Sequence, residues 1–148
     1  MTATTITRTA AASTSAAPTA RQEAARDAVV LAFRLVIGFL YAVHAVMPYG
    51  AFGGLDGQGA AAPVGSFPWV VGSLQLVGAI LIAAGLWTRP TAFVLSGVMA
   101  GAYFMVHQPM GALPVLNQGE PAALYSWVFL LLVAIGPGRY ALDTLRRR

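Results

Sequence analysis

Long apolar segments are the feature that most limits how this chain can fold. Four of them follow a polar N-terminal stretch, at about residues 28–49, 69–87, 91–107 and 120–136. A helix needs about 20 apolar residues to cross the hydrocarbon core of a bilayer, and the first three segments approach or exceed that length. The fourth is apolar only over residues 122–135 and reaches a spanning length if Glu120, Pro121 and Gly136 are counted. We therefore expect an all-α fold, an integral membrane four-helix bundle, with residues 28–143 as its transmembrane domain.

The composition also indicates a membrane protein. Hydrophobic residues make up 57% of the 148 residues and charged residues only 9%, whereas soluble domains average about 45–50% and about 25%. So few charges cannot cover a water-facing surface. Because the chain has no cysteine, disulfides, thiolate metal sites and thiol redox chemistry by this chain alone are excluded. The basic residues form no stripe interleaved with aromatic residues, so nucleic acid binding is not expected.

Both ends of the chain are polar. Residues 1–27 are rich in Thr, Ala and Ser and contain no apolar signal segment, so we expect a disordered, water-exposed tail in which residues 22–27 add one helical turn. An organellar transit peptide has a similar composition, but a bacterial tail is the preferred interpretation. Residues 144–148 form a basic C-terminal tail.

The arginines predict the orientation in the membrane. With four spans, all of them fall on or near the side that carries both termini and the loop around Arg89. By the positive-inside rule this side is cytoplasmic. We therefore expect a multi-pass protein of the bacterial inner membrane, with the N and C termini in the cytoplasm and the two longer loops outside.

Polar side chains within the spans converge at the outer end. At about 1.5 Å rise per residue, polar groups of all four helices reach a similar depth there. The candidate ligand-binding residues are His44, Gln75, His107, Glu120 and, in the preceding loop, Asn117. One acid and two imidazoles suit proton transfer, hydrogen bonding to quinone carbonyls or a weak metal site. A lone histidine at a helix end is most often solvated, so the convergence carries the prediction; no catalytic residue or metal site is assigned.

The spacing of polar residues predicts inward faces on two helices. Each set falls within one sector of its helix, as inward-facing residues do. The sets are Arg34, Gly38, Tyr41 and His44 in the first helix and Ser96, Tyr103 and His107 in the third. Two histidines on different helices could ligate a haem axially, but His107 lies too near the surface, so haem is not expected.

Arg34 lies near the inner end of the first span, and three explanations stay open. Its side chain could snorkel to the inner surface, pair with Asp143, or cap carbonyl groups of the GPGR turn that contains Arg139. We favour a structural role for Arg34. Gly97 and Gly101 form a GxxxG motif, which favours close helix packing either within the bundle or in a homo-oligomer.

Three stretches carry a resemblance to a known family. The first helix reads FRLVIGFLYAVHAV, the third ends GVMAGAYFMVHQP, and the last segment reads NQGEPAALYSWVFLLLVAIGPGRYALD. From about Ala28 to Asp143 the chain resembles the DoxX family of small four-helix bacterial membrane proteins. Family members commonly have a glycine after the first-helix histidine, a lysine shortly beyond it and a glutamate in the second helix. This chain has Ala45, Pro48 or its neighbours, and Gln75 in those places.

The resemblance implies two kinds of function. One branch of the family resembles the membrane subunit of a thiosulfate:quinone oxidoreductase, which handles quinone. Other members resemble membrane adaptors that gather soluble redox enzymes, such as superoxide dismutase and a sulfurtransferase, into an oxidative-stress complex. Whether the chain is an enzyme stays open, and its expected contacts are the lipid bilayer and either quinone or a soluble redox enzyme.

Residues and resemblance together favour a redox-associated subunit with a quinone or small polar ligand site in the outer half of the bundle. In this hypothesis His44 and Gln75 hold the ligand's oxygens, and His107 with Glu120 passes protons to the outer face. The alternative is a non-enzymatic membrane adaptor or assembly subunit that recruits soluble redox or stress-response enzymes. A small-solute transporter is less favoured because the chain shows no inverted repeat or broken helix.

Overall fold

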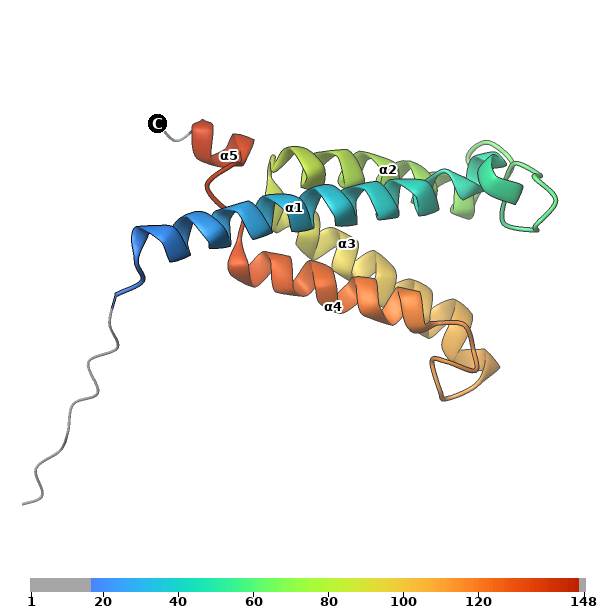
Figure 1. The fold of residues 1–148 in the computed structure, drawn as a ribbon. Helices are drawn as coiled ribbons and strands as arrows, with labels where there is room; N and C mark the ends of the chain where they lie inside the picture. The colour runs from blue at the N-terminus through green and yellow to red at the C-terminus, as the bar shows by residue number, and fades with distance from the viewer. Residues whose placement is uncertain (1–16, 147–148) are drawn as a thin grey trace, which may run out of the picture.

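A computed structural model describes residues 17–146, and within this range all regular structure is helical, with no strand. The predicted all-α fold is therefore confirmed. Figure 1 shows the main helices and a short fifth one near the C-terminal end. Their bounds are Ala20–Ala45 for α1, Phe67–Ala84 for α2, Thr88–Ala102 for α3, Glu120–Ile135 for α4 and Leu142–Leu145 for α5. The tail prediction for residues 1–16 and the last two residues of the predicted basic tail lie outside the described residues.

Helix α1 begins at Ala20, two residues before the helical turn expected at residues 22–27, and continues without a break into the first span. Thr19 and Gln22 form a capping box, in which each side chain accepts a hydrogen bond from the other's backbone amide. This reciprocal arrangement satisfies two of the free amides at a helix start. Residues 20–27 are therefore helical, and the 26-residue helix is about 39 Å long.

The other helices lie close to the predicted spans, with shifted ends. Helix α2 starts two residues before the predicted Trp69 and ends at Gly85, whose φ of +70° is the left-handed conformation that terminates helices. Helix α3 starts at Thr88 and changes at Tyr103–His107 into a π-helical turn, followed by a 3-10 turn at Gln108–Met110. The predicted third span is therefore not a uniform α-helix at its end.

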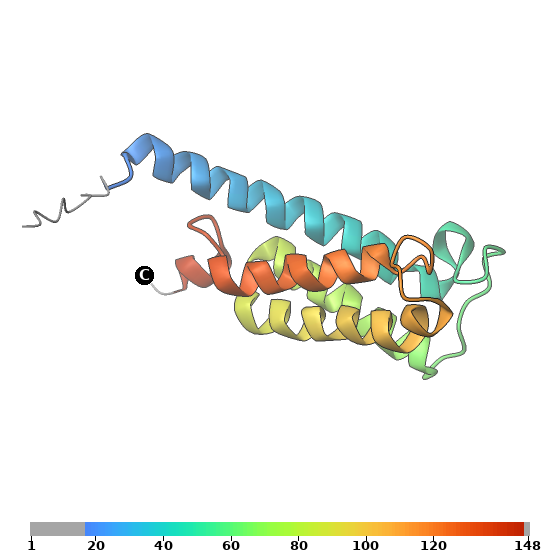
Figure 2. The same ribbon diagram turned by 90° about the horizontal axis from the view of Figure 1, so that it is seen from below.

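The helices form two pairs, α1 with α2 and α3 with α4, joined through contacts between α2 and α3. Figure 2 shows α4 running beside α3 along its length. The described chain ends lie at one end of the bundle, which we call the terminal end, and the loops 46–66 and 103–119 lie at the other, which we call the loop end. In Figure 1 the two pairs diverge toward the loop end.

Small residues allow the close approaches within the bundle. A Cβ at Gly38 of α1 would lie 2.9 Å from the Ala83 Cβ of α2, so glycine lets these helices touch. The buried core, which includes Ile82, Leu95, Phe129 and Leu132, lies between the pairs. By contrast, a Cβ at Gly97 or Gly101 would meet nothing within 4 Å. The GxxxG motif is therefore not a packing site inside the described bundle, and its use in a homo-oligomer stays a prediction.

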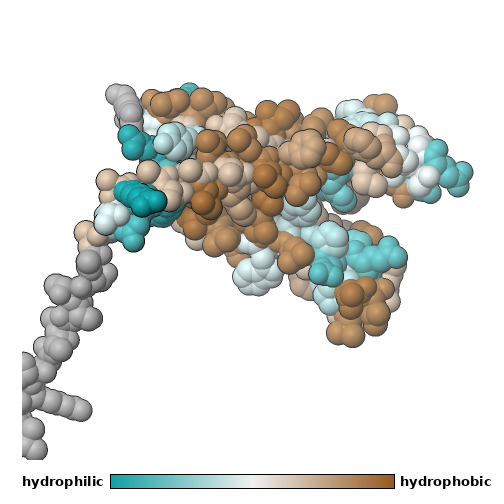
Figure 3. Space-filling view, in the orientation of Figure 1, coloured by the Kyte–Doolittle hydropathy of each residue, from teal (hydrophilic) through white to brown (hydrophobic). Residues whose placement is uncertain are grey.

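The outside of the bundle is apolar, as contact with lipid requires. Helical stretches Ala20–Tyr49, Phe67–Ala84 and Thr88–Met110 are long and apolar enough to cross a membrane, while α4 is apolar but has 16 residues. Figure 3 shows hydrophobic side chains covering the middle of the visible face, with hydrophilic ones mainly toward its ends. Because large apolar side chains at this density are not tolerated in water, the chain is a multi-pass membrane protein that contacts the bilayer.

Candidate ligand site at the loop end

The hydroxyl of Tyr41 is a buried polar group without a hydrogen-bond partner within residues 17–146, a property it shares with Arg34 Nε, Ser66 Oγ and Thr88 Oγ1. Helix α1 turns Tyr41 inward, where its side chain is fully buried. The hydroxyl lies close enough to the side chain of Gln75 on α2 to interact with it, but within residues 17–146 it forms no hydrogen bond of normal length and angle. Gln75 is also buried and donates from Nε2 only to the sulfur of Met99, at 3.6 Å. A buried hydroxyl without a partner costs about 1–3 kcal/mol, so this pair is ready to bind a further polar group.

Aromatic rings surround this pair on the side of α4. The ring centroid of Tyr41 lies 4.8 Å from that of Phe129 in an edge-to-face arrangement and 5.2 Å from that of Tyr125. Such pairs fix ring orientation through their quadrupoles and dispersion contacts. Tyr125 and Phe129 stand four residues apart on α4 and therefore present one aromatic face toward α1.

His44 lies near Tyr41 but not on the buried face predicted for it. The inward positions of α1 are Val30, Arg34, Gly38, Tyr41 and Ala45. Ala45 takes the place expected for His44, whose side chain is exposed. The prediction was off by one residue because the inward face repeats here at spacings of four, four, three and four. The imidazole stacks on Tyr41 at a centroid distance of 6.5 Å and lies within electrostatic range of His107.

His107 is held by the loop that precedes α4. Its Nδ1 lies 3.0 Å from the backbone oxygen of Asn117. A carbonyl oxygen only accepts hydrogen bonds, so Nδ1 carries a proton, and in the neutral imidazole Nε2 has the free lone pair. The π-helical turn of which His107 is the last residue rotates it relative to a regular helix, and such turns are frequent at functional sites.

Asn117 does not present its side chain to a ligand. It is buried, its Nδ2 donates to the Gly111 oxygen at 2.6 Å, and its Oδ1 accepts from the Gly119 amide at 2.8 Å. Both ends of the amide are thus used to fold the loop. Asn117 positions His107 through its backbone oxygen, which corrects the ligand-binding role predicted for its side chain.

Glu120 is the first residue of α4, and its side chain is exposed. It lines a groove between α1 and α4 with a volume of about 420 Å³. Within residues 17–146 no hydrogen bond joins it to His107, whose Nδ1 is directed to the loop instead. The structure therefore does not form the predicted proton relay between these two side chains. No group of three or more His, Asp or Glu residues in the same described range is placed to hold a metal ion.

At the terminal end, Arg34 joins three segments. Its side chain is fully buried, which is incompatible with snorkelling to the membrane surface. Nη1 donates to the oxygens of Ile82 and Ala83 at 3.5 and 3.4 Å, and Nη2 donates to the Tyr140 oxygen at 2.6 Å. Arg34 therefore caps the carbonyl end of α2 and holds the GPGRYALD turn, while Asp143 contributes to its electrostatic surroundings.

Asp143 caps the start of α3 in the same region. Its Oδ1 accepts from the Trp87 amide at 2.7 Å and its Oδ2 from the Thr88 amide at 2.9 Å. The backbone amide of Arg139 donates to Asp27 at 3.3 Å, while the Arg139 side chain is exposed. These contacts join residues 55 to 112 positions apart in sequence and close the bundle at the terminal end.

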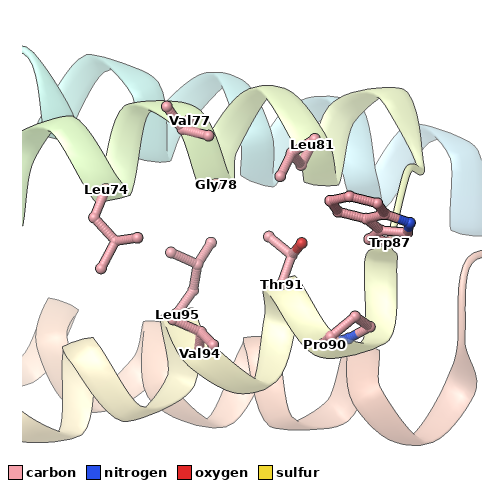
Figure 4. A pocket seen from close by; sticks show the side chains of 9 residues that line it. All are labelled: Leu74, Val77, Gly78, Leu81, Trp87, Pro90, Thr91, Val94 and Leu95. Carbon is pink, nitrogen blue, oxygen red and sulfur yellow. The ribbon is translucent and has the colours of Figure 1, made fainter.

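A second groove, between α2 and α3, carries none of the predicted site residues. It has a volume of about 230 Å³, and Figure 4 shows Leu74 and Leu95 directed into it, with Trp87 at one end. Apart from the Thr91 hydroxyl and the Trp87 indole its lining side chains are hydrocarbon or proline. It suits a lipid chain and offers no group for chemistry.

Sequence reasoning missed the aromatic residues of α4. Tyr125 stands four residues before Phe129 and three after Ala122, both of which are buried. This spacing marks an inward helical face and could have identified Tyr125. Tyr103 is half-buried beside Phe104, with ring centroids 5.3 Å apart.

The fold and the comparisons with known proteins agree. A bundle of long apolar helices with a polar cluster at one end defines a multi-pass helical membrane protein. The model of the DoxX family matches residues 29–108, which are 80 of the 148 residues. The chain therefore belongs to the DoxX family. The matched range contains α2 and α3 and all but the first turns of α1, whereas the resemblance noted from sequence extended through α4 to Asp143.

A relative from Haemophilus influenzae, described as an uncharacterized protein, is 41% identical over 118 residues. The alignment covers 76% of this chain and 87% of the relative. No match to a solved structure was found.

Proposed function

We propose that this DoxX protein is a redox-associated inner-membrane subunit that binds a quinone or a similar small polar ligand at the loop end of the bundle. The observation that carries the proposal is the fully buried Tyr41 hydroxyl, which has no partner within residues 17–146 and lies beside Gln75. Such a hydroxyl is costly to keep unless a ligand uses it.

The surroundings of Tyr41 suit a flat ring with carbonyl oxygens. Tyr41 and Gln75 both offer hydrogen-bond donors, and the Gln75 donor is engaged only with a sulfur atom. The rings of Tyr125 and Phe129 provide an apolar wall. A bound quinone would supply two-electron redox chemistry, and these side chains would bind and orient it. This moves the main hydrogen-bonding role from His44 to Tyr41 and Gln75.

The histidines would act beside the ring. His44 stacks on Tyr41, and the unprotonated Nε2 of His107 can accept a proton. Placement of the loop end outside the cytoplasm rests on the positive-inside rule, since the arginines within residues 17–146 lie at or near the terminal end. Both imidazoles would then exchange protons with the outer aqueous phase.

Tyr41→Phe tests the proposal because it separates binding from folding. The variant keeps the ring and removes the hydroxyl, so it should be about 1 kcal/mol more stable than the native protein. We expect its affinity for a soluble benzoquinone to fall at least tenfold, and that of His44→Ala to fall as well. Tyr140→Phe, at an exposed position of the terminal end, is the matched control. Native-like quinone content and affinity in both site variants would refute the proposal.

The alternative is a membrane adaptor without ligand chemistry. It is favoured by the exposed Arg139 and Arg146 side chains at the terminal end, which could dock a soluble enzyme or anionic lipid. A pull-down from native membranes distinguishes the two proposals. A stoichiometric redox partner that is lost on deletion of residues 144–148, from an isolate without quinone, would support the adaptor.

A further inference from the structure

We infer that the ligand enters sideways from the bilayer between α1 and α4, and that it is a neutral-headed molecule whose apolar chain stays in this groove. This inference rests on the proposed function, because it concerns the route to the Tyr41 site and the chemical class of its ligand. It is carried by the groove lining, by the position of Tyr125 and by the charge of Glu120.

Helices α1 and α4 belong to different pairs and make few direct contacts. Their aromatic side chains hold them apart, since Tyr41 meets Tyr125 and Phe129 across the interface. The groove between them, with its volume of about 420 Å³, falls in the range of small-molecule pockets, about 300–1,000 Å³. The groove is lined chiefly by Ile37, Leu40, Leu124, Tyr125, Val128 and Glu120.

Tyr125 connects this groove to the buried site. It is half-buried and lines the groove. Its ring centroid also lies 5.2 Å from that of Tyr41, whose hydroxyl is the unpartnered group. The ring of Tyr125 therefore lies between the groove and the ring of Tyr41, and a rotation of Tyr125 is the movement we infer for a ligand to pass inward.

The lining changes in polarity along the groove. The side chains of Ile37, Leu40, Leu124 and Val128 are hydrocarbon, and Glu120 stands where α4 begins at the loop end. An apolar chain would contact the first set, as it would contact lipid. A carboxylate repels an anionic head, such as that of a fatty acid or an acidic phospholipid. The donors of Tyr41 and Gln75 suit an uncharged head with acceptor oxygens. The occupant we infer is therefore a chain-bearing molecule with a neutral, hydrogen-bonding head, which is the chemistry of a lipid-soluble quinone.

Filling the groove tests the inference. Leu124→Trp adds bulk inside it, and Leu131→Trp makes the same change on another part of α4; the two leucines are 58% and 52% exposed, so both variants should fold. The probes are decylbenzoquinone and the same benzoquinone without its chain. Dissociation constants are measured calorimetrically on the full chain in lipid nanodiscs, with empty nanodiscs as the blank.

We expect Leu124→Trp to weaken binding of decylbenzoquinone at least tenfold and to leave the chain-free probe unchanged, while Leu131→Trp changes neither. Native affinity of Leu124→Trp for decylbenzoquinone would overturn the placement of the chain in the groove, and with it the lateral route that rests on this placement, and would leave the proposed function standing. Equal affinity of the native protein for both probes would overturn the role of the chain in the same way. If the native protein binds neither probe, the proposed function fails and this inference fails with it.

Discussion

The buried guanidinium of Arg34 is the contact on which the terminal end most depends, and Arg34→Met is the perturbation that tests this. Methionine keeps the length and apolar character of the side chain and removes every donor. The bonds that disappear join α1 to the Ile82 and Ala83 carbonyls of α2 and to Tyr140 in the turn before α5. The three segments would then meet through apolar contacts alone.

The expected loss follows from the lengths of these bonds. A hydrogen bond from a charged donor contributes about 1.5–3 kcal/mol, and we assign this to the Tyr140 bond at 2.6 Å. The bonds to Ile82 and Ala83, at 3.5 and 3.4 Å, are near the distance limit and together contribute about 1 kcal/mol. Methionine avoids the cost of burying the charge, which offsets part of the sum. We expect the free energy of unfolding to fall by about 2 kcal/mol.

The assay is reversible unfolding in mixed micelles by added SDS, followed by helical circular dichroism. Val36→Met is the matched control because Val36 lies two residues away on α1 and is 55% exposed. Such a substitution should stay within about 0.5 kcal/mol of the native protein. Equal unfolding free energies for Arg34→Met and Val36→Met would refute the structural role given to the arginine.

Two further predictions concern a glycine and a loop carboxylate. Gly85→Ala should lower the free energy of unfolding by about 2 kcal/mol in the same assay, because φ is +70° and the new Cβ would collide with the Arg34 guanidinium. The control is Gly97→Ala, whose new Cβ meets nothing within 4 Å and which should be neutral or stabilising by up to about 1 kcal/mol. A larger loss of stability in Gly97→Ala than in Gly85→Ala would contradict the packing described. Hydrogen bonds from backbone amides, first that of Gln58, lower the pKa of Asp56 below its ordinary 3.8. The stabilisation that these hydrogen bonds give to the loop is therefore complete above about the ordinary pKa of Asp56. It is lost as the pH falls through the lower pKa of the folded state. The protection factor of the Gln58 amide against hydrogen exchange should fall over that acid range, and in Asp56→Ala it should be low at every pH.

The fold followed from the sequence because lipid leaves few alternatives for an apolar chain. A segment of about 20 apolar residues in a bilayer must satisfy its backbone internally as a helix, so the spans could be located from hydropathy. The helix ends depended on local contacts that hydropathy does not report. The early start of α1 comes from the Thr19 and Gln22 capping box, and the end of α2 from the left-handed Gly85.

The site was less predictable because depth along a helix does not determine which way a side chain points. The rise per residue placed His44 and Gln75 toward the same end of the bundle. On α1, however, the buried residue at that depth is Ala45 and not His44. Loop geometry decided the role of Asn117, whose amide folds the segment before α4. The aromatic face of α4 beside Tyr41 was indicated in the sequence only by the four-residue spacing of Tyr125 and Phe129.

Helix α1 contributes to both ends of the bundle, which differ in how fully their buried polar groups are hydrogen-bonded. At the terminal end, Arg34 and Asp143 satisfy the exposed ends of α2 and α3 and fix the pairs together. At the loop end the pairs diverge (Figure 1) and Tyr41 keeps a buried hydroxyl without a partner. A bundle can retain such a cost where the rest of the structure is firmly held. The strength of the terminal contacts is therefore what would allow the loop end to accommodate the proposed ligand, and weakening Arg34 should loosen the packing around Tyr41 as well.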